Sequence, residues 1–164
     1  MAETLLVKGF QYHRWANLHL LDACARLSEE QLGLTAGGTY GTIADTFLHL
    51  LGAEQRYIRR LTGTEPRIGE QSEFPGLAAL RNEAESSGDR LIELAATVTA
   101  EQDIAPERLK NYSRLAAWVV LLQALHHGND HRTHICTILG SHGLEYGDMD
   151  VWAYGRSLGA AVAC

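Results

Sequence analysis

Residues 114–139 read RLAAWVVLLQALHHGNDHRTHICTIL, the longest apolar segment without proline. Its apolar side chains recur three or four positions apart, which is the period of one face of an α-helix. We expect a helix from about Arg114 to Leu139 that stops at Gly140 or Gly143, because glycine commonly follows the last helical turn. The face directed at the core would carry these residues: Val120, Ala124, His127, His131, Ile135 and Ile138.

Three further proline-free segments have the same period and can cover that face. They run from about Glu3 to Leu27, from about Thr42 to Leu61, and from Pro75 to Val98. Residues 63–75 are polar and contain glycine and proline, so they predict a long connection. The sequence therefore predicts an all-α fold, a four-helix bundle with a long crossover connection. We expect it to form one domain over residues 1–164, since this length suits a single domain.

Local signals support the predicted starts of two helical segments. Ser28 is followed three residues later by Gln31, and Thr42 is followed three residues later by Asp45. This spacing is typical of a capping box, in which the two side chains bind each other's backbone amides. The middle of the third long segment is small enough for a neighbouring helix to approach closely: Ala84, Ser87 and Gly88.

Composition restricts the class of protein. The chain has 46% hydrophobic residues, with 14 Lys and Arg against 20 Asp and Glu, for a net charge of −6. Broad nucleic-acid surfaces are built from Lys and Arg, so we expect no nucleic-acid partner. No uninterrupted apolar run is long enough for a membrane span, and the amino terminus lacks a signal-peptide pattern. Three scattered cysteines, Cys24, Cys136 and Cys164, form no disulfide framework. We therefore expect a soluble, cytoplasmic protein with no membrane partner.

Two histidines in the 114–139 segment suggest chemistry. His127 and His131 are four residues apart, so their side chains lie on one face of a helix. A buried imidazole without a partner costs about 1–3 kcal/mol, and two on one turn need a common reason. A divalent metal that takes one nitrogen from each ring is one such reason. A pair of hydrogen-bonded core histidines is the other, and the pattern alone does not separate them.

A third metal ligand has two candidates. His49 lies at the edge of the apolar stripe of the 42–61 segment, and His134 lies about one turn beyond His131. We favour His49, because ligands from two helices tie the bundle together and leave one side of the ion open to water or an anion. His126 faces another side of its helix and would be solvated or at an interface.

Other polar residues near these segments have two interpretations each. His13 and Asn17 interrupt the apolar face of the first helix, either as a buried hydrogen-bonded pair or as groups in the wall of a metal pocket. Glu54 follows His49 by little more than one turn. It could act as a base or accept a hydrogen bond from a ligand, although a glutamate in a helix is more often solvated.

Several motifs together resemble one known group of proteins. The stretches that carry the resemblance are Tyr12–Asn17, Tyr40–Ile43, Thr46–Leu50, His127–Arg132 and Asp150–Tyr154. In this order they are similar to the helix patterns of the DinB/YfiT-like superfamily and span most of the chain. The resemblance implies a four-helix bundle, often dimeric, that holds a divalent metal such as zinc or nickel. The metal ligands it implies are His49, His127 and His131.

Two departures from that pattern concern histidines. His134 stands where a glutamine or similar residue is expected, and His126 stands where asparagine is expected. Relatives in the superfamily include transferases and isomerases that use a low-molecular-weight thiol. The resemblance therefore implies a metal-dependent enzyme of the thiol-transferase/isomerase or hydrolase type acting on a small molecule. The alternative is a non-catalytic, stress-related metal-binding dimer.

Overall fold

The structure of the chain is a computed structural model that describes residues 3–69 and 71–162. Cys164, one of the three cysteines noted above, lies outside the described residues. Within them the chain forms six α-helices and one short 3₁₀ turn. Their bounds are α1 Leu5–Cys24, α2 Glu29–Leu32, α3 Ile43–Thr62, α4 Leu77–Thr97, the 3₁₀ turn η1 Pro106–Arg108, α5 Ala117–Ser141 and α6 Val151–Ser157.

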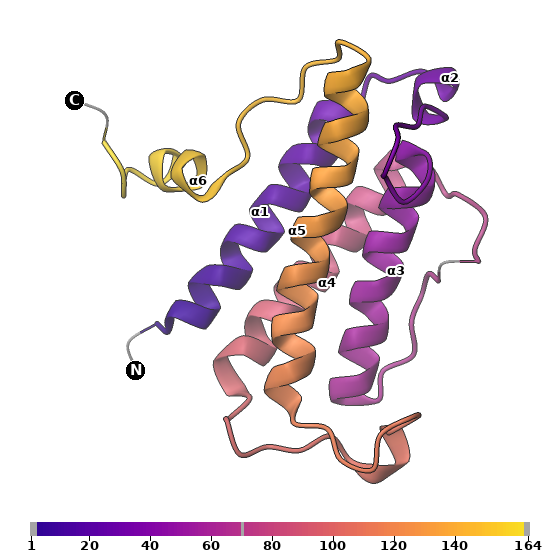
Figure 1. The fold of residues 1–164 in the computed structure, drawn as a ribbon. Helices are drawn as coiled ribbons and strands as arrows, with labels where there is room; N and C mark the ends of the chain where they lie inside the picture. The colour runs from indigo at the N-terminus through magenta and orange to yellow at the C-terminus, as the bar shows by residue number, and fades with distance from the viewer. Residues whose placement is uncertain (1–2, 70, 163–164) are drawn as a thin grey trace.

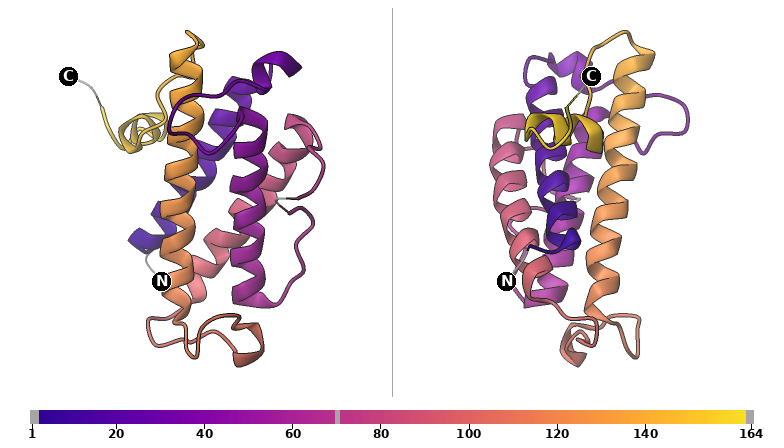
Figure 2. Two further views of the ribbon diagram at one scale, coloured as in Figure 1. Left: turned by 45° about the vertical axis from the view of Figure 1, so that its right-hand side comes forward. Right: turned by 90° about the vertical axis from the view of Figure 1, so that its left-hand side faces the viewer.

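Four long helices, α1, α3, α4 and α5, lie side by side as a bundle (Figure 1). Each helix packs against two others, with α1 on α4 and α5, and α3 on α4 and α5. The helices α3 and α4 run in the same direction, so the chain between them, residues 63–76, must return along the length of the bundle (Figures 1 and 2). The predicted all-α four-helix bundle with a long crossover is confirmed.

The short helix α6 lies outside the bundle and beside α1, as Figure 2 shows. Two aromatic contacts attach it: the Tyr154 ring lies 5.9 Å from Tyr12 and 5.4 Å from Trp15, measured between centroids. The Tyr12 hydroxyl also donates to the Met149 carbonyl oxygen at 3.0 Å. Aromatic side chains thus hold the tail to α1, and the apolar helical pattern of the sequence did not identify them as contacts.

Both predicted capping boxes are present, at Ser28 with Gln31 and at Thr42 with Asp45. Several predicted boundaries differ from the structure: α1 spans Leu5–Cys24 instead of Glu3 to Leu27, and the starts of α4 and α5 come later than predicted. Helix α4 begins at Leu77 instead of Pro75, because Gly76 has a positive φ of 89° that a helix excludes.

The other late start is that of α5, at Ala117 instead of Arg114. The residues just before it pair with an earlier loop in extended form. The Ile104 amide donates to the Leu115 carbonyl at 2.8 Å, and the Ala117 amide donates to the Gln102 carbonyl at 2.8 Å. This pairing takes the backbone groups that a longer helix would need.

The apolar core consists of two clusters at different levels along the bundle. One contains Leu20, Phe47, Leu80 and Ile138, with their neighbours, and the other contains residues nearer the opposite end. Representative members of the second cluster are Phe10, Ile58, Leu91 and Leu121. On each long helix, the positions between the two clusters carry buried polar side chains: His13, Asn17, Glu54, Ser87, His131 and Arg132. The bundle therefore has a polar layer between two apolar ones.

No helix in the described part of the chain is long and apolar enough to cross a membrane.

Candidate metal centre

The bundle brings together three histidines from two helices. His49 comes from α3, and His127 and His131 come from successive turns of α5. One ring nitrogen from each can be chosen so that all three lie within 4.8 Å of one another. We refer to these three residues as the histidine cluster. His131 is buried, whereas the other two side chains are partly exposed.

The spacing of the nitrogens suits a common ion. Nε2 of His127 lies 3.0 Å from Nε2 of His49. Two imidazole nitrogens bound to one zinc ion at about 2.0–2.1 Å are about 2.8–3.4 Å apart for coordination angles between 90° and 110°. Nδ1 of His127 is buried with no hydrogen-bond partner in the described structure. The cluster can therefore hold a metal ion with small side-chain adjustments.

The His127 ring is in the form that metals bind. Its pKa is lowered from the ordinary 6.5 to about 3, mainly by burial and in part by the neighbouring His131 and His49. Loss of hydration disfavours the imidazolium, and so do the positive charges its neighbours can carry. At neutral pH the ring is therefore uncharged and has a lone pair available for a ligand.

Two tyrosine rings border the histidine cluster. Tyr40, from the loop before α3, stacks on His49 with centroids 4.0 Å apart, and its ring meets His131 edge-on at 5.2 Å. Tyr57 meets His127 edge-on at 5.7 Å. Tyr40 keeps 49% of its surface exposed. One side of the cluster is thus covered by an aromatic ring that itself faces solvent.

The remaining predicted candidates separate clearly. His134 lies with its ring centroid 5.2 Å from that of His131, but it is not part of the converging group of three. Its Nδ1 is buried and lacks a hydrogen-bond partner in the described structure. His126 is exposed and pairs with Asp130 at 2.9 Å, as expected for a residue on another side of the helix.

Next to the histidine cluster, five side chains form a buried polar network: His13 and Asn17 of α1, Glu54 of α3, Ser87 of α4 and Arg132 of α5. Glu54 Oε1 binds His13 Nε2 at 2.7 Å and accepts from Asn17 Nδ2 at 2.6 Å. Its other oxygen accepts from the Ser87 hydroxyl at 2.6 Å. Arg132 lies opposite, with Nη1 2.7 Å from Asn17 Oδ1 and 3.2 Å from His13 Nδ1.

These contacts determine which nitrogen of His13 carries hydrogen. Arg132 can only donate, so His13 Nδ1 must accept, and Nε2 then carries the hydrogen donated to Glu54. Asn17 does the same with its amide, accepting from Arg132 and donating to Glu54. The buried cation and the buried carboxylate are therefore joined through two bridging side chains from α1.

The charges in the network are balanced. Burial raises the pKa of Glu54, but His13 and the hydrogen bonds from Ser87 and Asn17 outweigh burial and leave that pKa below its ordinary value. Glu54 is thus an anion at neutral pH. Burial lowers the pKa of Arg132, whose ordinary value is so high that the side chain stays cationic.

Part of this network was missed by sequence reasoning. The interpretation of Glu54 as solvated is wrong, because its side chain is completely buried. Arg132 entered only as part of a motif, yet it is 4% exposed. A signal existed for Glu54, since it continues the apolar stripe that includes Leu50 and Ile58. The buried-pair interpretation of His13 and Asn17 agrees with the structure.

Close packing against α5 depends on a glycine. A Cβ placed on Gly128 would lie 2.2 Å from Cε1 of His13, so no larger residue fits without displacing that ring. A similar approach occurs on α4, where a Cβ on Gly88 would lie 2.6 Å from Cγ of Arg14. The small residues noted in the third helical segment therefore do admit a neighbouring helix.

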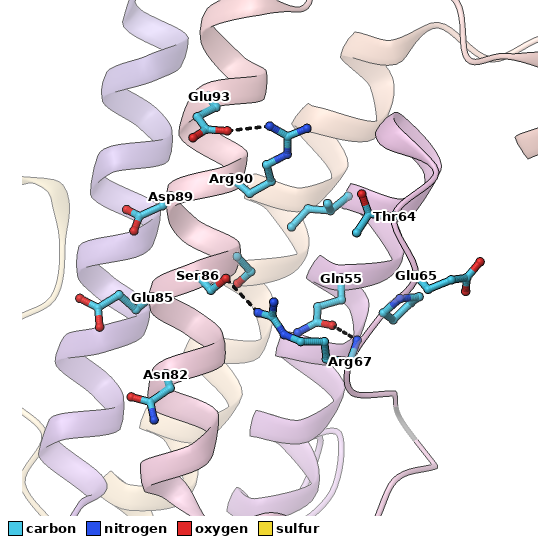
Figure 3. A pocket seen from close by; sticks show the side chains of 13 residues that line it. Gln55, Thr64, Glu65, Arg67, Asn82, Glu85, Ser86, Asp89, Arg90 and Glu93 are labelled. Carbon is cyan, nitrogen blue, oxygen red and sulfur yellow. Dashed lines mark hydrogen bonds and ion pairs between the residues drawn. The ribbon is translucent and has the colours of Figure 1, made fainter.

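A cavity of about 620 Å³ lies elsewhere, between α3, α4 and the crossover. Its polar side chains bind one another, as Figure 3 shows for Arg90 with Glu93 and for Arg67 with the Ser86 hydroxyl. Arg67 also pairs with Glu83 at 2.7 Å. None of the three clustered histidines lines this cavity. Ser87 lines this cavity and also belongs to the buried network, through its hydrogen bond to Glu54.

Comparisons with known proteins agree with this architecture. A DinB-like protein from Bacillus cereus has a similar structure, with a TM-score of 0.68 over 90% of this chain and 99% of that one. The two sequences are 15% identical, so the likeness concerns the fold. No curated protein matches the chain. The DinB family model matches residues 1–158, so the chain belongs to the DinB family.

Proposed function

We propose that His49, His127 and His131 hold a divalent metal ion, zinc or nickel, and that the chain is a metal-dependent enzyme acting on a small thiol or by hydrolysis. The observation that carries the proposal is the convergence of three ring nitrogens within 4.8 Å, from two helices. The neutral form of His127 supports it, since only an uncharged imidazole binds a metal.

The donor set favours an exogenous ligand. Three neutral imidazoles bring no negative charge, and the carboxylate of Glu54 is occupied by its own three hydrogen-bond partners. A divalent ion in such a site retains room for water or an anion and lowers the pKa of a bound thiol or water. A thiolate or hydroxide is therefore the ligand best matched to the charge of the site.

The chain itself would orient and shield that ligand. Tyr40 covers the His49 side of the cluster with the face of its ring, and Tyr57 borders the His127 side. Aromatic walls exclude water from part of the site and offer apolar surface to the body of a small molecule. We propose a substrate or cofactor with an anionic sulfur or oxygen at one end and an apolar or planar body.

The test uses protein purified without a histidine tag. Metal content is measured first, and the protein is then stripped and titrated with Co²⁺, whose absorption spectrum reports its ligands. We expect one ion per chain for the unaltered protein and none for folded His131→Ala. His126→Ala is the matched control, since His126 is exposed on the same helix and should bind normally.

Glutathione and azide are then added to the cobalt protein as probes. A new thiolate-to-cobalt band with glutathione, or a shifted spectrum with azide, would support an open catalytic site. Cobalt binding without a response to either probe would favour the non-catalytic alternative. Absence of stoichiometric binding would contradict both. The homodimer and the cytoplasmic location stay predictions, and gel filtration with light scattering measures the first.

A further inference from the structure

The buried polar network and the histidine cluster are interleaved along the same two helices. Arg132 directly follows His131, and Gly128, on which the His13 ring packs, directly follows His127. Glu54 lies five residues beyond His49 on α3. Each helix that supplies a clustered histidine therefore also supplies a charged member of the network, close to that histidine.

Those two charged members are connected through the first helix. The path from Glu54 on α3 to Arg132 on α5 runs through both side chains of α1 in parallel, His13 and Asn17. Ser87 of α4 donates to Glu54 and lies outside this path. The α1 bridge thus adds a polar connection between α3 and α5 to their direct packing, whereas the Ser87 contact joins α4 to α3.

The histidine cluster needs such a support. Three similar ring nitrogens that face one another gain little from their own contact until a cation lies between them. Metal sites bind tightly when the ligands are held in place before the ion arrives. The network is solvent-excluded and its donors match its acceptors, so it can supply that rigidity.

We propose that the α1 bridge, formed by His13 and Asn17 between Glu54 and Arg132, positions the three histidines and thereby determines the metal affinity of the site. The inference rests on the proposed function, since it requires that the cluster binds a metal. His13 and Asn17 are positioning residues in this scheme. They act on the ion only through the helices they join.

The experiment compares three replacements at one position. His13→Leu removes both the acceptor for Arg132 and the donor to Glu54. His13→Gln keeps both, because its amide can accept from Arg132 and donate to Glu54 as Asn17 already does. His13→Asn also has an amide but is one methylene shorter, so it cannot contact both partners, and it serves if the leucine variant does not fold.

Zinc affinity is measured by competition with a chromophoric chelator, at a temperature where each metal-free variant is fully folded by circular dichroism. We expect zinc affinity to fall about 10–100-fold in His13→Leu and in His13→Asn, the range found when groups supporting metal ligands are lost. His13→Gln should stay within about threefold of the unaltered protein on this scale.

Ser87→Ala separates positioning from general stabilisation. It removes a hydrogen bond of the same network and should lower the resistance to urea, yet it leaves the α1 bridge intact. We expect zinc affinity to change less than about twofold, well below the loss expected for bridge variants. Folded His13→Leu or His13→Asn with unaltered zinc affinity would overturn the inference, as would equal losses in Ser87→Ala or in His13→Gln. If the unaltered protein binds no zinc, the proposed function fails instead.

Discussion

The buried polar network and the histidine cluster are neighbours in this bundle, and they differ in how completely their hydrogen-bonding groups are paired. In the buried polar network five hydrogen bonds each join a donor to an acceptor, and the Arg132 cation is linked to the Glu54 anion. In the histidine cluster three nitrogens of the same kind face one another, and burial keeps the His127 ring uncharged. The network pairs its polar groups within the protein, whereas the histidine cluster would be stabilised most by a bound cation.

The difference assigns separate roles to neighbouring residues. Buried ionic groups are costly to maintain, and a pair of them rarely stabilises more than a well-packed apolar alternative. Such a network is therefore better explained by the arrangement it enforces than by its net energy. The histidine cluster lies at the edge of that arrangement, where partly exposed rings can meet a ligand from solvent.

The largest effect should come from removing one charge of the network. Glu54→Leu leaves Arg132 buried without its anion, so we expect a loss of about 3–5 kcal/mol in the free energy of unfolding. Urea denaturation of the metal-free protein measures it. Glu93→Leu, which breaks an exposed ion pair with Arg90, is the control and should cost about 0–1 kcal/mol. A loss in Glu54→Leu no larger than in this control would show that the network is not structurally important.

A metal ion should stabilise the protein through the other group. Zinc at about 100 times its dissociation constant should add about 2.7 kcal/mol to the unfolding free energy, because it binds only the folded chain. The gain should vanish in His49→Ala and persist in His126→Ala, as measured by urea denaturation with and without zinc. A gain that survives in His49→Ala would place the binding site outside the histidine cluster.

The fold was accessible to sequence reasoning because its signals are local. The apolar period, the positions of the three prolines and the two capping boxes all act within a few residues. The missed boundaries depend on more distant structure. Gly76 adopts a positive φ before α4, and the backbone pairing around Ala116 delays the start of α5. Helix α6 has seven residues, too few for the period to stand out.

The candidate site was accessible in part. The spacing of His127 and His131 indicates a shared face, whereas the choice of His49 over His134 needed an argument about helix pairing and the family resemblance. The apolar stripe of α3 indicated the burial of Glu54 but could not establish it, because its partners come from two other helices, α1 and α4. A charged residue on an apolar stripe is ambiguous until those partners are known.

The close packing of α1 against α5 at Gly128 tests whether the His13 ring is held rigidly, with a smaller expected loss of stability. Gly128→Ala would press a methyl group against the His13 ring, so we expect a loss of about 1–3 kcal/mol from overpacking. Gly140→Ala, on the same helix, meets only Tyr146 at an ordinary 3.8 Å and should stabilise the helix by up to about 1 kcal/mol. Urea denaturation compares the two. Equal effects would mean that His13 can move without cost.

Lowering the pH should affect the histidine cluster more than the buried polar network, and we expect this to be the smallest stability effect of the series. His127 has a folded pKa of about 3 against an ordinary 6.5, so between these values the unfolded chain binds more protons. Metal-free protein should therefore lose stability as the pH falls below about 6.5, and the effect is moderated by water because the ring is partly exposed. Glu54, whose pKa is lowered from 4.5, stays largely ionised down to pH 5 in both states and adds little in that window.

The measurement is the urea midpoint at pH 7 and at pH 5 with a chelator present. We expect His127→Gln to lose less stability over this interval than the unaltered protein, because the replacement cannot take up a proton when unfolded. His126→Gln is the control, since its ring is exposed and pairs with Asp130 at the surface. If His127→Gln and the unaltered protein have the same pH dependence, the cluster is well enough hydrated to bind protons freely. The lowered pKa of His127 would then no longer support metal binding, and the geometry of the three ring nitrogens would be the remaining support.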